Sequence, residues 1–159
     1  MIQVDNDEIM IFDFDFNEDN LLLEYEKFIK DAVEYEDNIT PKLDFWLVAR
    51  GIEFDSSERI QEIFGVRGKP RFYNLKAESE IPMHTDRGTL CSLNIILDGD
   101  ESAPVDYSSG NSYHYKVALL NTTLMHGVKN GKEERKLFKL SFFENTFEEM
   151  KDIIREAIA

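Results

Sequence analysis

The strand that decides the fold reads Arg135-Lys-Leu-Phe-Lys-Leu-Ser-Phe-Phe143. Successive residues of a strand face opposite sides of a sheet. One face is apolar and carries Phe138, Leu140 and Phe142. The other face carries Arg135, Leu137, Lys139 and Ser141. We therefore expect a strand from Lys136 to Phe143 that points a cation and a hydroxyl into a barrel and packs its opposite face on helices.

Further runs of β-forming residues precede this strand, and residues typical of turns separate them. We expect long strands at Arg71–Lys76, Thr89–Leu97 and Tyr113–Leu120, and short ones at Val105–Tyr107 and His126–Val128. The turn signals are Asp98-Gly99 and Asn130-Gly131, and the second is typical of a β-hairpin. The sequence thus predicts a series of mainly antiparallel strands in a sandwich or a barrel.

Helices are expected before and after this series of strands along the chain. Alternation predicts a strand at Ile9–Phe16, and helical spacing then predicts a helix that begins at Asn17 or Asn20 and ends near Tyr35. A strand at Leu43–Val48 follows, and Asp55 or Ser56 begins a helix that ends at Gly65. A last helix follows Thr146, which forms a capping box with Glu149. These elements predict an α+β domain.

Composition limits the classes of function. The chain has 159 residues and a net charge of −14, from 32 acidic and 18 basic residues, which argues against binding to nucleic acid or to anionic membranes. A basic peptide or protein partner is compatible with this charge. Cys91 is the single cysteine, which excludes a disulfide within the chain and a cysteine-rich metal site. The first residues lack the pattern of a signal peptide, so we expect a cytoplasmic protein.

The stretch Pro82-Met-His-Thr-Asp-Arg-Gly88 contains a candidate metal site. If it lies where a strand enters a loop, His84 and Asp86 project to the same side and Thr85 points away. A histidine from a neighbouring strand, His126, would complete a triad of two imidazoles and one carboxylate, which leaves three positions open on an octahedral Fe(II) ion. The alternative is a hydrogen-bonded loop, because a His-x-Asp pattern is short enough to arise by chance.

A buried arginine needs an anion. If Arg135 points into the barrel, a dicarboxylate would supply one, since a guanidinium binds a carboxylate with two hydrogen bonds. The alternative is that Arg135 ends a charged hairpin, Lys129–Lys136, in solvent.

Four segments together resemble the Fe(II)/2-oxoglutarate-dependent oxygenases, and most nearly their aspartyl/asparaginyl β-hydroxylase-like and prolyl hydroxylase-like branches. The segments are His84–Gly88, Ser92–Leu97, Leu120–Asn130, and Arg135 nine residues after His126. The resemblance covers roughly residues 71–143, about half of the chain. Their combination is far more specific than His-x-Asp alone.

The resemblance implies a double-stranded β-helix (a jelly roll, as in cupins) at residues 71–143, within one domain that spans residues 1–159. Residues 1–70 would supply helices that pack on the major sheet, and residues 144–159 the C-terminal helix. It further implies a dioxygenase that uses Fe(II), 2-oxoglutarate and O2 to hydroxylate an unactivated C–H bond and releases succinate and CO2. A side chain of a peptide or protein is the first choice of substrate, and a small metabolite is the second.

The resemblance also assigns residues. His84, Asp86 and His126 match the iron ligands, and Arg135 matches the residue that binds the C5 carboxylate of 2-oxoglutarate. Asn94 is a candidate contact for the co-substrate. Lys136 and Lys139 are alternatives to Arg135, and Lys139 precedes Ser141 in a basic-x-Ser arrangement found in other branches. Strand alternation favours Arg135 or Lys139, because Lys136 shares a face with Phe138.

Two other classes of function stay open at this stage. The same barrel and triad are compatible with a cupin-like metalloenzyme that does not use 2-oxoglutarate. They are also compatible with a non-catalytic protein that binds a ligand in the pocket. The third histidine, His114, is expected to be a surface residue and not a ligand.

Overall fold

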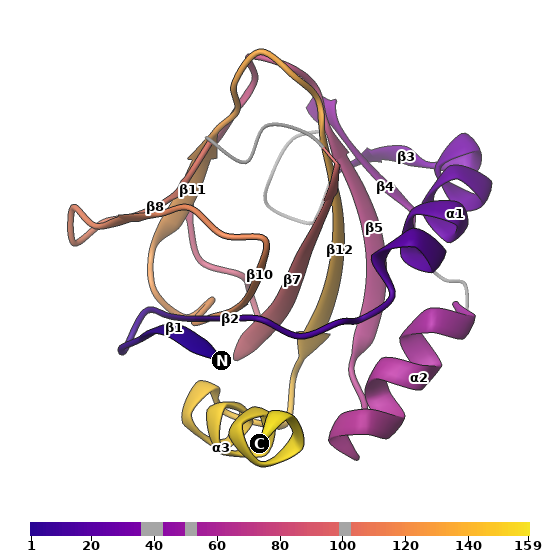
Figure 1. The fold of residues 1–159 in the computed structure, drawn as a ribbon. Helices are drawn as coiled ribbons and strands as arrows, with labels where there is room; N and C mark the ends of the chain where they lie inside the picture. The colour runs from indigo at the N-terminus through magenta and orange to yellow at the C-terminus, as the bar shows by residue number, and fades with distance from the viewer. Residues whose placement is uncertain (36–42, 50–53, 99–102) are drawn as a thin grey trace.

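Two β-sheets face each other in the computed structural model, which describes residues 1–35, 43–49, 54–98 and 103–159 (Figure 1). The large sheet has eight strands, in the order β1 (Ile2–Asp5), β2 (Ile9–Phe12), β10 (Val117–Leu120), β7 (Cys91–Asp98), β12 (Arg135–Phe142), β5 (Lys69–Leu75), β4 (Leu43–Ala49) and β3 (Val33–Tyr35). The small sheet has four, in the order β6 (Glu80–His84), β11 (His126–Lys129), β8 (Val105–Tyr107) and β9 (Ser112–Tyr113).

The two faces of β12 behave as the alternation predicts. Phe138, Leu140 and Phe142 are fully buried in the outer core, between the large sheet and the helices. Arg135 and Lys139, on the opposite face, line a pocket between the two sheets. β12 pairs with β7 on one side and with β5 on the other, so it lies in the interior of the large sheet.

Three α-helices cover the outer face of the large sheet: α1 (Glu18–Phe28), α2 (Asp55–Phe64) and α3 (Phe147–Ile158). Figure 1 shows α1 and α2 beside β4 and β5, and α3 across one end of the sheet. Each helix contributes a large buried side chain to the outer core, namely Tyr25, Phe54 at the start of α2, and Met150. The predicted α+β jelly roll, with N-terminal helices on the major sheet and a C-terminal helix, is confirmed.

A second, smaller core lies between the sheets. Ile9, Ile96, Val105 and Leu120 are among its buried residues, and they come from β2, β7, β8 and β10. This inner core fills only part of the space between the sheets, and the pocket occupies another part. No helix in the described part of the chain is long and apolar enough to span a bilayer.

Several predicted boundaries were wrong in the first third of the chain. The strand expected at Ile9–Phe16 ends at Phe12. The helix expected to reach Tyr35 ends at Phe28, and a 3-10 turn (Ile29–Asp31) and the edge strand β3 follow. Pairing of β3 with β4 overrides the weak helical spacing of these residues. The helix that ends at Gly65 begins after Phe54, so Asp55 lies inside its first turn.

Two predictions in the second half were also wrong. The run Tyr113–Leu120 is split, because β9 ends at Tyr113 in the small sheet and β10 begins at Val117 in the large sheet. Asn130-Gly131 does not form a hairpin, since β11 and β12 belong to different sheets. Instead the buried Asn130 amide donates hydrogen bonds to three backbone carbonyls, those of Leu75, Lys76 and Glu133. The predicted turn at Asp98-Gly99 extends outside the described residues.

Candidate metal centre and its pocket

The two candidate histidines face each other across neighbouring strands of the small sheet. β6 and β11 pair antiparallel, with His126 directly opposite His84 and their ring centroids 4.6 Å apart. His126 also lies opposite Tyr107 of β8, whose ring centroid is 5.8 Å from its own. The Tyr107 hydroxyl donates a hydrogen bond of 2.9 Å to the Glu8 carbonyl, which holds the Tyr107 ring beside the imidazole.

A short loop after β6 positions Asp86. Its backbone N–H donates to the Thr122 carbonyl at 3.1 Å, and its carbonyl accepts from the Thr89 N–H at 3.3 Å. The Thr122 hydroxyl, which is fully buried, donates to the Thr89 carbonyl at 3.0 Å. The loop that carries the carboxylate is thus hydrogen-bonded to the loop that precedes His126. Thr85 is exposed, which agrees with the expectation that its side chain points away from the site.

Hydrogen bonds to the backbone indicate which nitrogen of each imidazole carries a proton. Nδ1 of His84 lies 2.8 Å from the Pro82 carbonyl oxygen, and Nδ1 of His126 lies 2.7 Å from the Leu124 carbonyl oxygen. A carbonyl oxygen only accepts, so each Nδ1 carries a proton. In a neutral ring this leaves the Nε2 lone pair for a metal ion, with the backbone carbonyl as the partner that orients the ligand.

Both Nε2 atoms converge on one oxygen of Asp86. Oδ1 lies 3.1 Å from Nε2 of His84 and 3.4 Å from Nε2 of His126. One ligand atom from each of the three residues lies within 4.8 Å of the other two. Lone pairs that point at one another repel unless a cation lies among them, either a proton on a ring or a metal ion. The donor set is that of the facial triad, which binds Fe(II) and leaves coordination positions open.

Lys139 binds the other oxygen of this carboxylate. Its Nζ lies 2.5 Å from Oδ2 of Asp86, and both side chains are 13% exposed. Burial by itself would raise the pKa of the Asp86 carboxyl, but Lys139 and hydrogen bonds with both histidines hold that pKa well below its usual range. Burial also acts to lower the pKa of His84, and the hydrogen bonds with Asp86 and the Pro82 carbonyl outweigh it and raise the pKa.

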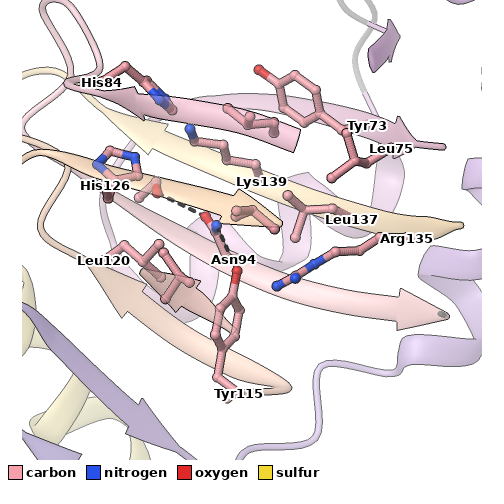
Figure 2. A pocket seen from close by; sticks show the side chains of 14 residues that line it. Tyr73, Leu75, His84, Asn94, Tyr115, Leu120, His126, Arg135, Leu137 and Lys139 are labelled. Carbon is pink, nitrogen blue, oxygen red and sulfur yellow. Dashed lines mark hydrogen bonds between the residues drawn. The ribbon is translucent and has the colours of Figure 1, made fainter. Parts of the chain in front are cut away.

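The pocket extends from the two histidines to Arg135, and Lys139 projects into it between them (Figure 2). Its apolar lining consists of Leu75, Ile81, Val105, Leu120, Val128 and Leu137. Its polar lining consists of Tyr73, His84, Ser92, Asn94, Tyr115, His126, Arg135 and Lys139. By area the surface of this cavity is mostly apolar, and such a surface with convergent polar groups is typical of a small-molecule site.

Arg135 is a buried cation at the far end of this pocket. It is 3% exposed, donates one hydrogen bond of 2.8 Å to the Ala103 carbonyl, and lies 5.5 Å from the centroid of the Tyr115 ring. No carboxylate in residues 1–35, 43–49, 54–98 or 103–159 forms an ion pair with it. A buried guanidinium with five donors and one neutral acceptor is suited to binding an anion from outside the protein.

A chain of polar side chains connects the middle of the pocket. The Ser92 hydroxyl donates to Oδ1 of Asn94 at 2.8 Å, and Nδ2 of Asn94 donates to the Tyr115 hydroxyl at 3.2 Å. Because the Tyr115 hydroxyl accepts from Asn94, its own proton is available to a ligand beside Arg135. The sequence did not single out Tyr115, since the wrong strand boundary around it hid which way its side chain points.

The structure brings together most of the residues that the sequence singled out. Asn94, Arg135 and Lys139 line the pocket with the two histidines. Ser141 lies buried on the same face of β12 but outside the pocket lining. Lys136 points the other way, where its Nζ lies 2.9 Å from Glu26 of α1. His114 is exposed in the connection between β9 and β10.

Comparisons with known proteins find similarity only in three-dimensional structure. No protein-family model matches the chain, and no curated protein sequence matches it. Among solved structures, the viral collagen prolyl hydroxylase vCPH from Paramecium bursaria Chlorella virus 1, in complex with 2-oxoglutarate, superimposes with a TM-score of 0.64 at 10% identity, over 86% of this chain and 95% of that one.

Two further structures superimpose over similar lengths. A prolyl hydroxylase from Trichoplax adhaerens, in complex with a peptide fragment of the hypoxia-inducible factor, gives a TM-score of 0.58 at 11% identity, over 88% of this chain and 80% of that one. HygX from Streptomyces hygroscopicus, with nickel and 2-oxoglutarate bound, gives a TM-score of 0.55 at 11% identity, over 84% of this chain and 82% of that one. At such low identity these likenesses establish a shared fold.

Proposed function

We propose that this protein is an Fe(II)- and 2-oxoglutarate-dependent dioxygenase that hydroxylates an unactivated C–H bond. One observation carries the proposal: a triad of metal-ligand type lies at one end of a pocket, and at the other lies a buried arginine that forms no ion pair with a carboxylate of the described residues. The reaction would convert 2-oxoglutarate, O2 and the C–H bond of a substrate into succinate, CO2 and an alcohol.

His84, Asp86 and His126 would hold the metal through two Nε2 atoms and Oδ1 of the carboxylate. Bound Fe(II) would supply the redox chemistry with O2, which no side chain of the triad can perform. The hydrogen bonds from Nδ1 of each ring to a backbone carbonyl keep both imidazoles in the tautomer that a metal requires. Lys139 keeps Asp86 ionised and occupies its second oxygen, so the carboxylate offers one oxygen to the metal.

Arg135 would bind the C5 carboxylate of 2-oxoglutarate. Lys139, the residue in contact with Asp86, lies four positions further along β12, which corresponds to about 13 Å along a strand. An extended arginine side chain and a five-carbon dicarboxylate together can bridge such a distance. The Tyr115 hydroxyl and Asn94 lie along this path and can donate or accept hydrogen bonds.

The proposal for the substrate is a side chain of a peptide or protein, with a small molecule as the alternative. The Trichoplax prolyl hydroxylase, which shares the fold, holds a peptide fragment. HygX shares the fold equally well and holds 2-oxoglutarate and nickel. One fold can host many substrates, so the shared fold is compatible with either kind.

The test is anaerobic titration with Fe(II) followed by addition of 2-oxoglutarate and O2. We expect one metal ion to bind per chain and succinate to form slowly even without a substrate. His84→Ala and Asp86→Ala should lose both properties, whereas His114→Ala, which replaces the exposed histidine, should keep them. If metal binds but 2-oxoglutarate neither binds nor turns over, a metalloenzyme with another co-substrate is the better assignment. Failure to bind metal at all would indicate a ligand-binding protein.

A further inference from the structure

A row of cations lies on the inner face of the large sheet beside the candidate metal centre. β5 and β12 pair without a register shift, with Leu137 opposite Tyr73, Lys139 opposite Arg71, and Ser141 opposite Lys69. Tyr73 lines the pocket, so alternation along β5 places Arg71 and Lys69 on the same inner face. Arg71 therefore lies next to Lys139, two residues along β5 from Tyr73, which lines the pocket.

This arrangement places two positive charges side by side. Directly opposite residues on one face have Cβ atoms about 5 Å apart, and like charges in such pairs destabilise a sheet. Lys139 is compensated, because its Nζ contacts Asp86. Arg71 is half-buried, and the structure shows no hydrogen bond or ion pair of its side chain with any residue that it describes. In a chain with a net charge of −14, a half-buried cation that forms no ion pair with the residues described by the structure is unexpected.

The charges of the pocket reinforce this argument. Arg71, Lys139 and Arg135 lie along one face of two paired strands, and among the described residues the ion pairing of this row consists of the contact between Lys139 and Asp86. Under the proposed function, a divalent metal would add two positive charges and 2-oxoglutarate would remove two. Among the described residues, the excess of positive charge next to Arg71 would persist, and an anionic group of the substrate would balance it.

We infer that the substrate carries an anionic group, a carboxylate or a phosphate, and that Arg71 binds it. The inference rests on the proposed function and narrows its substrate. Arg71 neighbours the residue in contact with Asp86, so a substrate held there would lie beside the metal centre and away from Arg135. A guanidinium binds either anion through two parallel hydrogen bonds, which fixes both position and orientation.

The neighbourhood of Arg71 is open to solvent. Lys69, two residues earlier on the same face, is exposed, and its Nζ lies 4.7 Å from the centroid of the Phe143 ring. Phe143 is itself 37% exposed and follows β12 directly. A substrate can therefore reach Arg71 from this end of the barrel, along a rim that offers one further cation and one aromatic surface.

The test compares two matched pairs of probes on protein loaded with Zn(II) and saturated with 2-oxoglutarate. The carboxylate pair is N-acetylaspartate α-amide and N-acetylasparagine amide. The phosphate pair is N-acetyl-O-phosphoserine amide and N-acetylserine amide. Binding is measured by calorimetry and by the NMR signals of the arginine Nε–Hε groups, and Arg71→Gln identifies the signal of Arg71. Arg59→Gln, on the exposed face of α2, is the control for an equal change in net charge.

We expect at least one anionic probe to bind at least tenfold more tightly than its neutral match and to shift the Arg71 signal. Arg71→Gln should abolish this preference, and Arg59→Gln should retain it. Equal binding of anionic and neutral probes, no binding of either anion, or an unchanged preference in Arg71→Gln would each overturn the inference. Binding of 2-oxoglutarate is measured in the same experiment, so a failure of the proposed function is visible separately from a failure at Arg71.

Discussion

Asp86 presents its two carboxylate oxygens to different partners. Oδ1 faces both imidazoles, and Oδ2 is held by Lys139. Arg135, on the same face of β12 as Lys139, contacts a backbone carbonyl and an aromatic ring instead. The two cations of one strand face thus differ in what they can do: Lys139 is committed to the candidate metal ligand, and Arg135 retains donors for an anion.

This difference leads to a prediction for 2-oxoglutarate. Arg135→Gln should weaken its binding by on the order of 2–5 kcal/mol, or about 30-fold or more, because the C5 carboxylate of 2-oxoglutarate would lose its buried cationic partner. Metal binding should persist, since Arg135 is not part of the triad. Isothermal titration of the metal-loaded protein measures both affinities.

The matched control is Lys136→Gln, one residue along the strand. It removes the same charge from the outer face, where Lys136 contacts Glu26, and should leave the affinity for 2-oxoglutarate unchanged. Loss of affinity in Lys139→Gln with no loss in Arg135→Gln would transfer the role to the lysine. The metal triad would be unaffected by that result.

Strand alternation correctly predicted which faces Arg135, Lys136 and Lys139 occupy, because the pattern lies within one strand. The partners of these cations could not be predicted. Asp86 is 53 residues from Lys139 in sequence, and Ala103 is 32 residues from Arg135. Likewise, the position of Arg71 beside Lys139 could not be predicted, since that pairing follows from the register of β5 against β12.

At the scale of elements, the metal centre depends on the close approach of β6 and β11. The register between these strands shifts next to His126, where Gly127 follows. A Cβ atom at Gly127 would lie 2.7 Å from the Ile81 carbonyl oxygen and 3.1 Å from the Met83 nitrogen. These are backbone atoms, so only a movement of one strand can make room.

We therefore predict that Gly127→Ala destabilises the fold by about 1–3 kcal/mol and also weakens metal binding, because it separates the strands that carry His84 and His126. Urea denaturation measures the first effect and metal titration the second. Gly68→Ala is the control, since its Cβ would lie 2.7 Å from the Ser141 carbonyl oxygen, in the large sheet. It should cost similar stability with little effect on the metal. Equal loss of metal affinity in both variants would contradict the explanation.

Ion pairs attach the C-terminal helix α3 to β1 of the N-terminal hairpin. The buried ammonium of Lys151 lies 2.9 Å from Oδ1 of Asp5, and Arg155 contacts the other oxygen of Asp5. The hydrogen bond from Arg155, followed by that from Lys151, outweighs partial burial and lowers the pKa of Asp5.

A lowered native pKa gives stability that is present above the unfolded pKa of Asp5, about 4, and is lost as the pH falls through the native pKa. Asp5→Asn should therefore lower the free energy of unfolding at pH 7 by on the order of 1 kcal/mol, because solvent screens the partly exposed Asp5 carboxylate. The difference from the wild type should shrink as the pH falls below about 4. Urea denaturation at pH 7 and pH 3 measures this. A stability difference of the same size at both pH values would show that the charge of Asp5 does not cause it.

The elements themselves were predictable where one local rule determines them. The α3 capping box between Thr146 and Glu149 is present as predicted, and so is the left-handed Gly65 that ends α2. Predictions failed where pairing with a strand distant in the sequence determines the local structure. Val33–Tyr35 becomes a strand because β4 lies beside it, and Asn130-Gly131 becomes a connection between sheets because β12 pairs with β5 and β7.

For the molecule as a whole, the charge of the surface and the charge of the pocket have opposite signs. The chain carries a net charge of −14, whereas the inner face of β5 and β12 carries Arg71, Lys139 and Arg135. The negative surface permits a basic polypeptide partner, but it acts over distances that salt screens. The cations of the pocket act at contact distance. Discrimination between substrates should therefore follow the pocket, and the surface should mainly affect association rates.

The same charge balance predicts how salt affects stability. At about 10 mM salt the Debye length is about 30 Å, so the acidic groups repel one another across the molecule, and at about 150 mM it is about 8 Å. We predict that the melting temperature rises over this range of NaCl, because screening relieves the repulsion more than it weakens the ion pairs. Repeating the measurement with Arg71→Gln separates screening from chloride binding at Arg71. The rise should remain in the variant, and a melting temperature that falls with salt would show that ion pairs such as those of Lys151 outweigh the net repulsion.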